Sequence, residues 1–311
     1  MPRPVCWLGI LASILLAIPL SSVEAQYQTR TRLDWVTIET ERFAFHFPRE
    51  LEPWAQSVAG KMEAIDSSVS RVVGFQPRKK IEVVLDDPFR ISNGSAWPLL
   101  DAPTMVLWAA PPNPREDIGN YVSWADMLAT HEFAHLAHLL RPTRNPLQSL
   151  LWKLAPVELG PISRKSPRWM IEGYATYVEG LITKSGRPNG VWRPAILRQW
   201  AIEGALPTYR QLDAMGGMYG GDFAYLAGSA FVEWLVERRG DSSVVDLWRR
   251  LSARNDRGFG DAFTGVYGEP PDVLYGRFAS QLTADAIAMR DLGRRTNADT
   301  GTTIQHLARE T

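Results

Sequence analysis

Residues 122–140 read VSWADMLATHEFAHLAHLL and contain the run His131-Glu132-Phe133-Ala134-His135. Pro142 follows this stretch, so the predicted helix must end before residue 142. On a helix, residues four apart lie one above the other on the same face. His131 and His135 therefore present two imidazoles to one point, with Glu132 beside them. This pattern is typical of a helix that binds Zn²⁺ and holds a general base next to it.

A catalytic zinc site takes three protein ligands and a water, so a third ligand is needed from another helix. Glu172 interrupts an apolar stretch of a helix predicted at residues 167–178, with Ser166 as its N-cap. A carboxylate among apolar neighbours needs a cation or donors, which makes Glu172 the expected third ligand. Glu179, seven residues on, is the alternative ligand or an acceptor for a histidine N–H. His138 lies past the metal on the same stripe, so it is expected either to support a ligand by a hydrogen bond or to pack in the core.

The overall composition is that of an ordinary globular protein. Of its 311 residues, 45% are hydrophobic and 22% are charged, and 34 basic residues balance 34 acidic ones. Because the formal net charge is zero, the chain shows no sign of a polyanion-binding surface. We therefore expect no nucleic-acid partner.

The N-terminus has the pattern of a secretory signal peptide. Arg3 precedes an apolar run at residues 5–20, and small residues at 21–25 offer a cleavage site. Pro19 interrupts the run, which is shorter than the roughly 20 residues of a spanning helix, so a cleaved signal is favoured over a membrane anchor. The only cysteine, Cys6, lies in this segment, so the mature protein would have neither a disulfide nor a thiol nucleophile. We expect a secreted or periplasmic protein without a membrane span.

The hydrophobic pattern predicts an α+β fold with an active-site cleft between two subdomains. In residues 26–120 it predicts a small sheet with one long helix, the strands at 42–47, 81–85 and 104–108 and the helix at 53–73. Residues 121–295 are predicted to be mostly helical, with further helices at 194–202, 223–239, 242–251 and 272–292. Residues 1–25 form the signal, and the polar residues 296–311 are a linker or the start of a further domain.

The segment Trp169-Met170-Ile171-Glu172-Gly173-Tyr174-Ala175, together with the run 131–135, resembles the gluzincin metallopeptidases of the wider MA clan. These are the thermolysin-like and aminopeptidase-like enzymes. The resemblance implies a zincin-like helical subdomain in which His131, His135 and Glu172 bind Zn²⁺ and Glu132 is the catalytic base. It also extends to secreted bacterial members in which the peptidase-like domain precedes a β-propeller. If the polar tail from Thr296 is the entry to such a propeller, this chain is a fragment of a longer protein.

A third segment, Tyr225-Leu226-Ala227-Gly228, resembles the Y-x-x-G segment of the aminopeptidase branch. The resemblance implies that Tyr225 donates a hydrogen bond to the oxyanion, with Tyr219 as the alternate donor. The chain also departs from the family. His135 and Glu172 are further apart in sequence than usual, and the insert 139–167 between them is a candidate lid or substrate loop. The segment 92–96 lacks the acidic residue that holds a substrate amine in aminopeptidases.

These observations lead to two functional hypotheses. The first is a zinc-dependent peptidase, in which metal-activated water hydrolyses a peptide bond, Glu132 acts as base and Tyr225 stabilises the oxyanion. Its substrate would be a peptide or protein. The alternative is a non-catalytic module that uses the same zinc as structural support and binds a peptide or another partner. A structural site needs no base, so the presence of Glu132 favours the peptidase.

Overall fold

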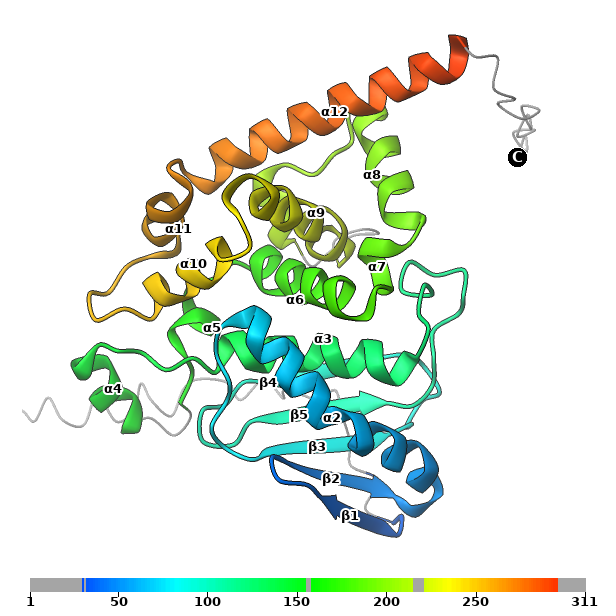
Figure 1. The fold of residues 1–311 in the computed structure, drawn as a ribbon, viewed down its shortest axis with the longest axis vertical. Coiled ribbons are helices and arrows are strands. Elements are labelled where there is room, and N and C mark those ends of the chain that lie inside the picture. Colours follow the sequence, from blue (N-terminus) through cyan, green and yellow to red (C-terminus); the bar gives the residue numbers. More distant parts are fainter. Residues whose placement is uncertain (1–29, 31, 155–157, 215–220, 296–311) are drawn as a thin grey trace, which may run out of the picture. The chain divides into compact units, whose positions relative to one another are not determined.

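The computed structural model describes residues 30, 32–154, 158–214 and 221–295 (Figure 1). The chain divides into two compact units, Met1–Asp34 and Trp35–Thr311, and every strand and helix below lies in the second. The predicted signal, residues 1–25, and the tail 296–311 lie outside the described residues. Among the helices that the structure describes, none combines the length and the apolar character needed to cross a membrane.

A five-stranded mixed sheet forms the first layer, in the order β1-β2-β3-β5-β4. The strands are β1 (Trp35–Glu39), β2 (Phe43–Pro48), β3 (Ile81–Asp86), β4 (Gly94–Trp97) and β5 (Thr104–Trp108). β2, β3 and β5 run parallel, whereas β1 and β4 pair antiparallel at the two edges. The three predicted strands are confirmed, whereas β1 and β4 were not predicted. β4 is short and reads GSAW, which has little β propensity, whereas β1 reads WVTIE and carries β-forming residues that were overlooked.

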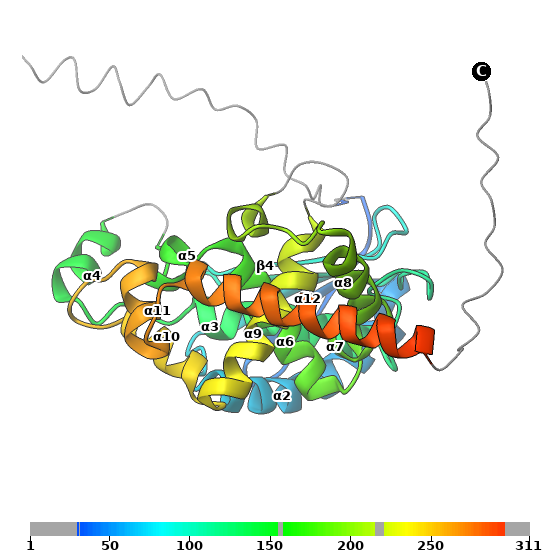
Figure 2. The same cartoon turned by 90° about the horizontal axis from the view of Figure 1, so that it is seen from above.

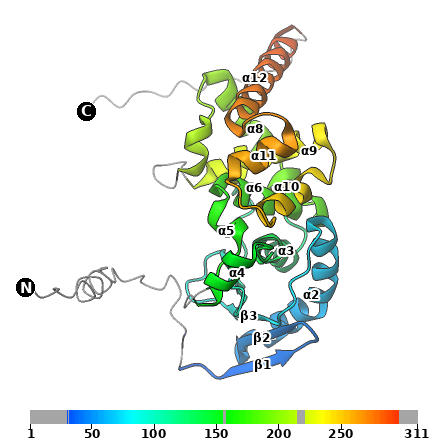
Figure 3. The ribbon, with the colours of Figure 1, turned by 90° about the vertical axis from the view of Figure 1, so that its left-hand side faces the viewer.

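The helices are stacked above one face of this sheet (Figure 1). α2 (Glu52–Val73) contacts β2, and α3 (Trp124–Leu139) contacts β4, β5 and α2. α6 (Arg168–Thr183) covers α3, and α9 (Asp222–Arg239) covers α6. Figure 3 shows α3 almost end-on, with the sheet on one side and α6 on the other. The predicted α+β fold class is confirmed.

The remaining helices surround this stack (Figure 2). They are α4 (Pro146–Lys153), α5 (Pro161–Lys165), α7 (Gly186–Asn189), α8 (Trp192–Glu203), α10 (Ser243–Leu251), α11 (Phe259–Tyr267) and α12 (Pro271–Arg295), with 3₁₀ turns at Arg49–Leu51 and Tyr209–Asp213. α4, α5, α7 and α11 were not predicted. Three of them are short or lie in the insert, where hydrophobic periodicity has little length in which to develop.

α3 is the central helix, and 15 of its 16 residues are buried. Trp124–Leu139 is buried on nearly every side, so the helix packs against the sheet, α2 and α6 together. Phe133 packs edge-on against Phe43 of β2, and each such fully buried ring contributes about 1.5–3 kcal/mol. Ser123 is its N-cap, since Ser123 Oγ accepts a hydrogen bond from Asp126 N at 3.3 Å. Such burial fixes the positions of the polar side chains that α3 also carries.

The start of α6 differs from the prediction. The helix begins at Arg168, with Pro167 as N-cap residue, and the hydroxyl of Ser166 makes no capping bond. Instead, Trp169 N donates to Asp213 Oδ1 at 3.0 Å, so a carboxylate distant in sequence satisfies a free N–H of the first turn. The predicted N-cap at Ser166 was therefore wrong, because a tertiary contact replaced the local one.

Candidate metal centre

α3 and α6 bring the three predicted ligands together. His135 Nε2 lies 3.2 Å from Glu172 Oε2, and His131 Nε2 lies 3.9 Å from the same oxygen. One ligand atom from each residue lies within 4.8 Å of the other two. The two histidines are buried, while the Glu172 side chain is 20% exposed and so faces an opening. Glu172 is far from the histidines in sequence, and the packing of α6 on α3 brings it next to them.

The charges at this site call for a cation between the three residues. Burial on its own would raise the pKa of Glu172, but His135 and His131 outweigh it and hold that pKa well below the usual range. Burial disfavours a charged His131, yet the proximity of Glu172 and Glu179 outweighs this and raises its pKa to about 10. The cluster thus attracts positive charge strongly, and a metal ion held by the same atoms would take the place of a proton.

A second carboxylate, Glu179, sets the orientation of His131. Glu179 is fully buried, and its Oε2 accepts the Nδ1 proton of His131 at 2.9 Å. Its other oxygen accepts from Arg187 N at 3.2 Å. Gly186 has a φ of +76° and passes so close to Glu179 that any Cβ there would overlap the carboxylate. The sequence left two roles open for Glu179, metal ligand or acceptor for a histidine N–H. The hydrogen bond from His131 shows it as the acceptor.

This donor set fits Zn²⁺. Two imidazole nitrogens and one carboxylate oxygen are ligands that zinc commonly takes in hydrolytic sites. Because the Nδ1 proton of His131 goes to Glu179, the Nε2 lone pair of that ring is left for a metal. His135 Nδ1 is buried and has no hydrogen-bond partner among the described residues. His131, His135 and Glu172 would therefore hold the ion, with Glu179 behind the first of them.

Glu132 lies on α3 beside the two histidines and lines the adjoining cleft. It is buried, and this burial raises the pKa of its carboxyl group against the opposing effect of the histidines. Gly94, at the start of the edge strand β4, makes room for it: a Cβ at residue 94 would lie 2.7 Å from Glu132 Oε1. The carboxylate is thus held between α3 and the sheet edge while remaining in the wall of the cleft.

Tyr225, in the first turn of α9, lies across the cleft from these residues. Its ring centroid is 6.1 Å from that of His131. The guanidinium groups of Arg187 and Arg168 lie 4.6 Å and 5.3 Å from the Tyr225 ring, in cation–π geometry. Burial raises the pKa of Tyr225, so its hydroxyl keeps its proton and is available as a donor. Tyr219, the alternate donor, lies outside the described residues.

The cleft has a volume of about 190 Å³ and includes charged groups that the sequence analysis did not identify. Arg187 lines it, and Arg187 Nε donates to Asp117 Oδ2 at 3.0 Å. Asp222, at the start of α9, also lines it, and burial raises the pKa of that carboxyl. Arg187 lies in a four-residue helix and Asp222 outside any motif, so neither gave a signal in the sequence.

His138 has the packing role, one of the two that were expected of it. It is fully buried and stacks on Trp248 with ring centroids 5.1 Å apart, while Tyr174 meets it edge-on at 5.4 Å. Its Nδ1 lies 2.6 Å from Ala134 O, to which it donates. Burial lowers the pKa of His138 to about 3, so the ring is neutral.

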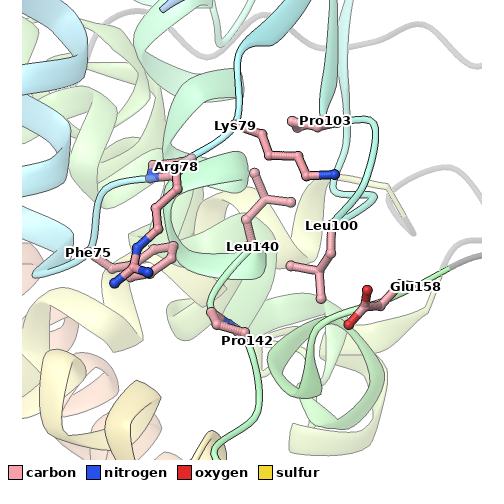
Figure 4. A pocket seen from close by; sticks show the side chains of 9 residues that line it. Phe75, Arg78, Lys79, Leu100, Pro103, Leu140, Pro142 and Glu158 are labelled. Carbon is pink, nitrogen blue, oxygen red and sulfur yellow. The ribbon is translucent and has the colours of Figure 1, made fainter. Parts of the chain in front are cut away.

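A larger cavity of about 320 Å³ lies elsewhere, where the loop after α2, the β4–β5 connection and the end of α3 meet (Figure 4). Phe75, Leu100 and Leu140 form its apolar wall, and Arg78 and Lys79 are its basic residues. None of the residues of the metal centre lines this cavity. The smaller cleft is therefore the candidate site for metal-dependent hydrolysis.

Comparison with protein-family models gives no match, and comparison with curated proteins gives none either. Native yeast LTA4 hydrolase has a similar fold, with 11% identity and a TM-score of 0.46 over 78% of this chain and 38% of that chain. An M1 zinc metallopeptidase from Deinococcus radiodurans gives 15% identity and a TM-score of 0.39 over 81% of this chain and 51% of that one. The chain is structurally similar to M1 zinc metallopeptidases. It spans about half, or less, of the length of these structures, and the similarity concerns the fold alone.

Proposed function

We propose that this protein is a zinc-dependent peptidase. The observation that supports the proposal most directly is the position of Glu132 beside His131, His135 and Glu172, in the wall of a cleft that Tyr225 also lines. A structural metal site would need the three ligands but not the adjacent carboxylate or the cleft. The combination is that of a site where a water is activated and a carbonyl is attacked.

His131, His135 and Glu172 would hold a zinc ion, which would polarise the scissile carbonyl and make a water acidic enough to lose a proton near neutral pH. Glu132 accepts that proton on its carboxylate and transfers it to the leaving amine. Tyr225 donates its hydroxyl proton in a hydrogen bond to the developing oxyanion. Glu179 holds the Nδ1 proton of His131 and so keeps that ring in the required tautomer.

The sheet edge supports a peptide as substrate. β4 is the last strand of the sheet in the described order, and Ser92, Asn93 and Gly94 line the cleft next to Glu132. An extended peptide binds readily along such an edge, because its backbone pairs with the free N–H and C=O groups of the strand. The scissile bond of a peptide bound there would lie beside the catalytic carboxylate.

The variant Glu132→Gln tests the proposal. It is expected to retain about one zinc per chain, because the ligands are unchanged, and to lose peptide hydrolysis by a factor of at least about 10²–10⁴. Zinc is measured by elemental analysis of the purified protein, and hydrolysis with a library of quenched fluorescent peptides. Full activity in Glu132→Gln would exclude this residue as the base.

Glu172→Ala provides the matched variant for the metal. It is expected to lose zinc and activity together, whereas Glu132→Gln loses activity alone. Zinc retained by the wild type, with no hydrolysis of any peptide, would support the non-catalytic binding module instead. Absence of zinc from the wild type, even after reconstitution, would refute both functions.

We also propose that the protein acts outside the cytoplasm, as a secreted or periplasmic enzyme. This rests on residues 1–25, which have the pattern of a cleaved signal and lie outside the described residues. N-terminal sequencing of the exported protein is expected to begin near Gln26. An unprocessed N-terminus in the membrane fraction would contradict this expectation.

A further inference from the structure

The insert between the two ligand helices contains a helix whose apolar face is turned to solvent. α4 and its C-cap residue present Leu147, Leu150, Leu151 and Leu154, the spacing of one continuous helical stripe. These four leucines, called the leucine stripe below, are 57–78% exposed. In most globular proteins such a stripe packs on the core. Figures 1 and 2 both show α4 at the margin of the helical layers, away from the stack of α3, α6 and α9.

Contacts at both ends of α4 hold the helix against the rest of the protein. Arg144 Nη2 donates to Arg249 O at 2.9 Å, and Asn145 Nδ2 donates to Arg254 O at 2.8 Å. Asn145 is also the N-cap, since its side chain accepts from Gln148 N at 3.0 Å. At the other end, the guanidinium of Arg164 lies 4.6 Å from the Trp152 ring. Both ends of the helix are therefore attached to the protein, and the leucine stripe is left exposed, without a covering partner among the described residues.

The surroundings of the stripe are basic, although the chain as a whole is neutral. Residues 139–167 contain five arginines and lysines and one acidic residue, and residues 249–257 contain four arginines and one acidic residue. Arg144, Arg164 and Arg254 are exposed, and none of them forms an ion pair within the described part of the chain. Asp246 and Asp256, the acidic neighbours, are already paired with Arg249 and Lys165. Uncompensated positive charge thus flanks the exposed leucines.

We propose that the leucine stripe and the flanking arginines attach this protein to the surface of an anionic lipid bilayer. A short helix that lies in the interface needs an apolar face to enter the acyl region and basic side chains at the level of the headgroups. α4 supplies the first, and Arg144, Arg164 and Arg254 supply the second. Each arginine near an anionic surface strengthens binding by about fivefold.

Two features favour a bilayer over a protein partner. α4 lies at the margin of the helical layers (Figures 1 and 2), and its four leucines are 57–78% exposed, so a protein would need a matching groove of its own, whereas a bilayer needs none. Basic side chains also lie near both ends of α4, since Arg144 precedes the helix and Arg164 contacts Trp152 near its C-terminal end. Attachment through α4 would be peripheral and would leave the fold intact, which makes it separable from the proposed catalysis.

The experiment is co-flotation of the purified mature chain with large vesicles of phosphatidylcholine containing about one-third phosphatidylglycerol. Pure phosphatidylcholine vesicles serve as the uncharged comparison. We expect binding to the anionic vesicles that is lost between about 0.1 M and about 1 M NaCl, as the Debye length falls from about 10 Å to about 3 Å. Leu150→Ser/Leu151→Ser is expected to reduce binding at least about tenfold, since each leucine loses apolar burial in the bilayer.

Met289→Ser/Leu292→Ser is the matched control. These two residues of α12 are 57% and 58% exposed, so the same apolar loss is made at another site. The control is expected to bind like the wild type, and Arg164→Gln/Arg254→Gln to bind more weakly with a smaller salt dependence. Thermal unfolding is expected to be unchanged in the serine variants, because the replaced side chains are exposed.

Failure of the wild type to float with anionic vesicles would overturn the proposal, as would equal binding of the two serine variants. Concentration-dependent dimerisation that disappears in Leu150→Ser/Leu151→Ser, without vesicle binding, would assign the stripe to a second copy of the chain instead. Flotation with vesicles measures binding without any hydrolysis, so the outcome of this test does not depend on the proposed peptidase function.

Discussion

Gly173→Ala is expected to destabilise the protein by forcing α6 and α9 apart. A Cβ at residue 173 would lie 2.6 Å from the carbonyl carbon of Gly228 and 2.9 Å from both Gly228 O and Ser229 N. Ordinary Cβ contacts are 3.4–4 Å long. The neighbouring atoms belong to the backbone of α9, so they cannot rotate away as a side chain would. The two helices must therefore separate or bend, and Glu172 and Tyr225 lie on either side of that contact.

Gly60→Ala is the control that isolates this effect. Gly60 is in the middle of α2, and a Cβ there meets nothing within 4 Å. Both substitutions gain about 1 kcal/mol of helix propensity, so the difference between the variants reports the clash alone. Overpacking of a filled interior costs about 1–3 kcal/mol, and we expect Gly173→Ala to be less stable than Gly60→Ala by that amount.

The assay is urea unfolding followed by tryptophan fluorescence, with the free energy extrapolated to water. A chelator is present throughout, so that stabilisation by bound metal does not enter the comparison. In a parallel titration, zinc is expected to bind more weakly to Gly173→Ala and normally to Gly60→Ala. Equal free energies of unfolding for the two variants would refute the close approach of α6 and α9 at this residue.

Three further results are expected. Glu179→Gln should weaken zinc about 10–100-fold, measured by competition with a chelating dye, because the charged partner of His131 is lost; unchanged affinity would contradict that role. Tyr225→Phe should lower kcat/KM by about 10²–10³ at unchanged zinc content, as loss of one oxyanion donor does; wild-type kinetics would exclude it as a donor. Zinc at 100 times its Kd should stabilise the wild type by about 2.7 kcal/mol in thermal unfolding and leave Glu172→Ala unaffected; an equal response of both would place the metal elsewhere.

Much of the fold could be predicted because its signals are local. The long apolar pattern of α2, the three central strands and the helices α3, α6 and α9 all lie where hydrophobic periodicity placed them. β4 could not be found in this way, since Gly94–Trp97 has little β propensity and forms a strand by pairing with β5. The same holds for the start of α6, where Asp213 satisfies the N–H of Trp169.

The charged residues of the cleft show the same limit. Arg187 and Asp117 are 70 residues apart, and their 3.0 Å contact exists only because the chain returns to the same place. No spacing rule connects two such residues. The outward direction of the leucine stripe is also a tertiary result, because its spacing alone predicts a helix that packs on the core.

The sequence by itself determined that His131 and His135 share one face of a helix with Glu132 beside them, because the i, i+4 spacing leaves no other arrangement. It favoured Glu172 as the third ligand but could not exclude Glu179. Residues seven apart lie on nearly the same face of α6, about 10.5 Å apart along its axis. Only the packing of α6 on α3 decided that Glu172 meets the two Nε2 atoms and that Glu179 meets Nδ1 of His131. The position of one helix along another depends on their side-chain contacts, which no local pattern contains.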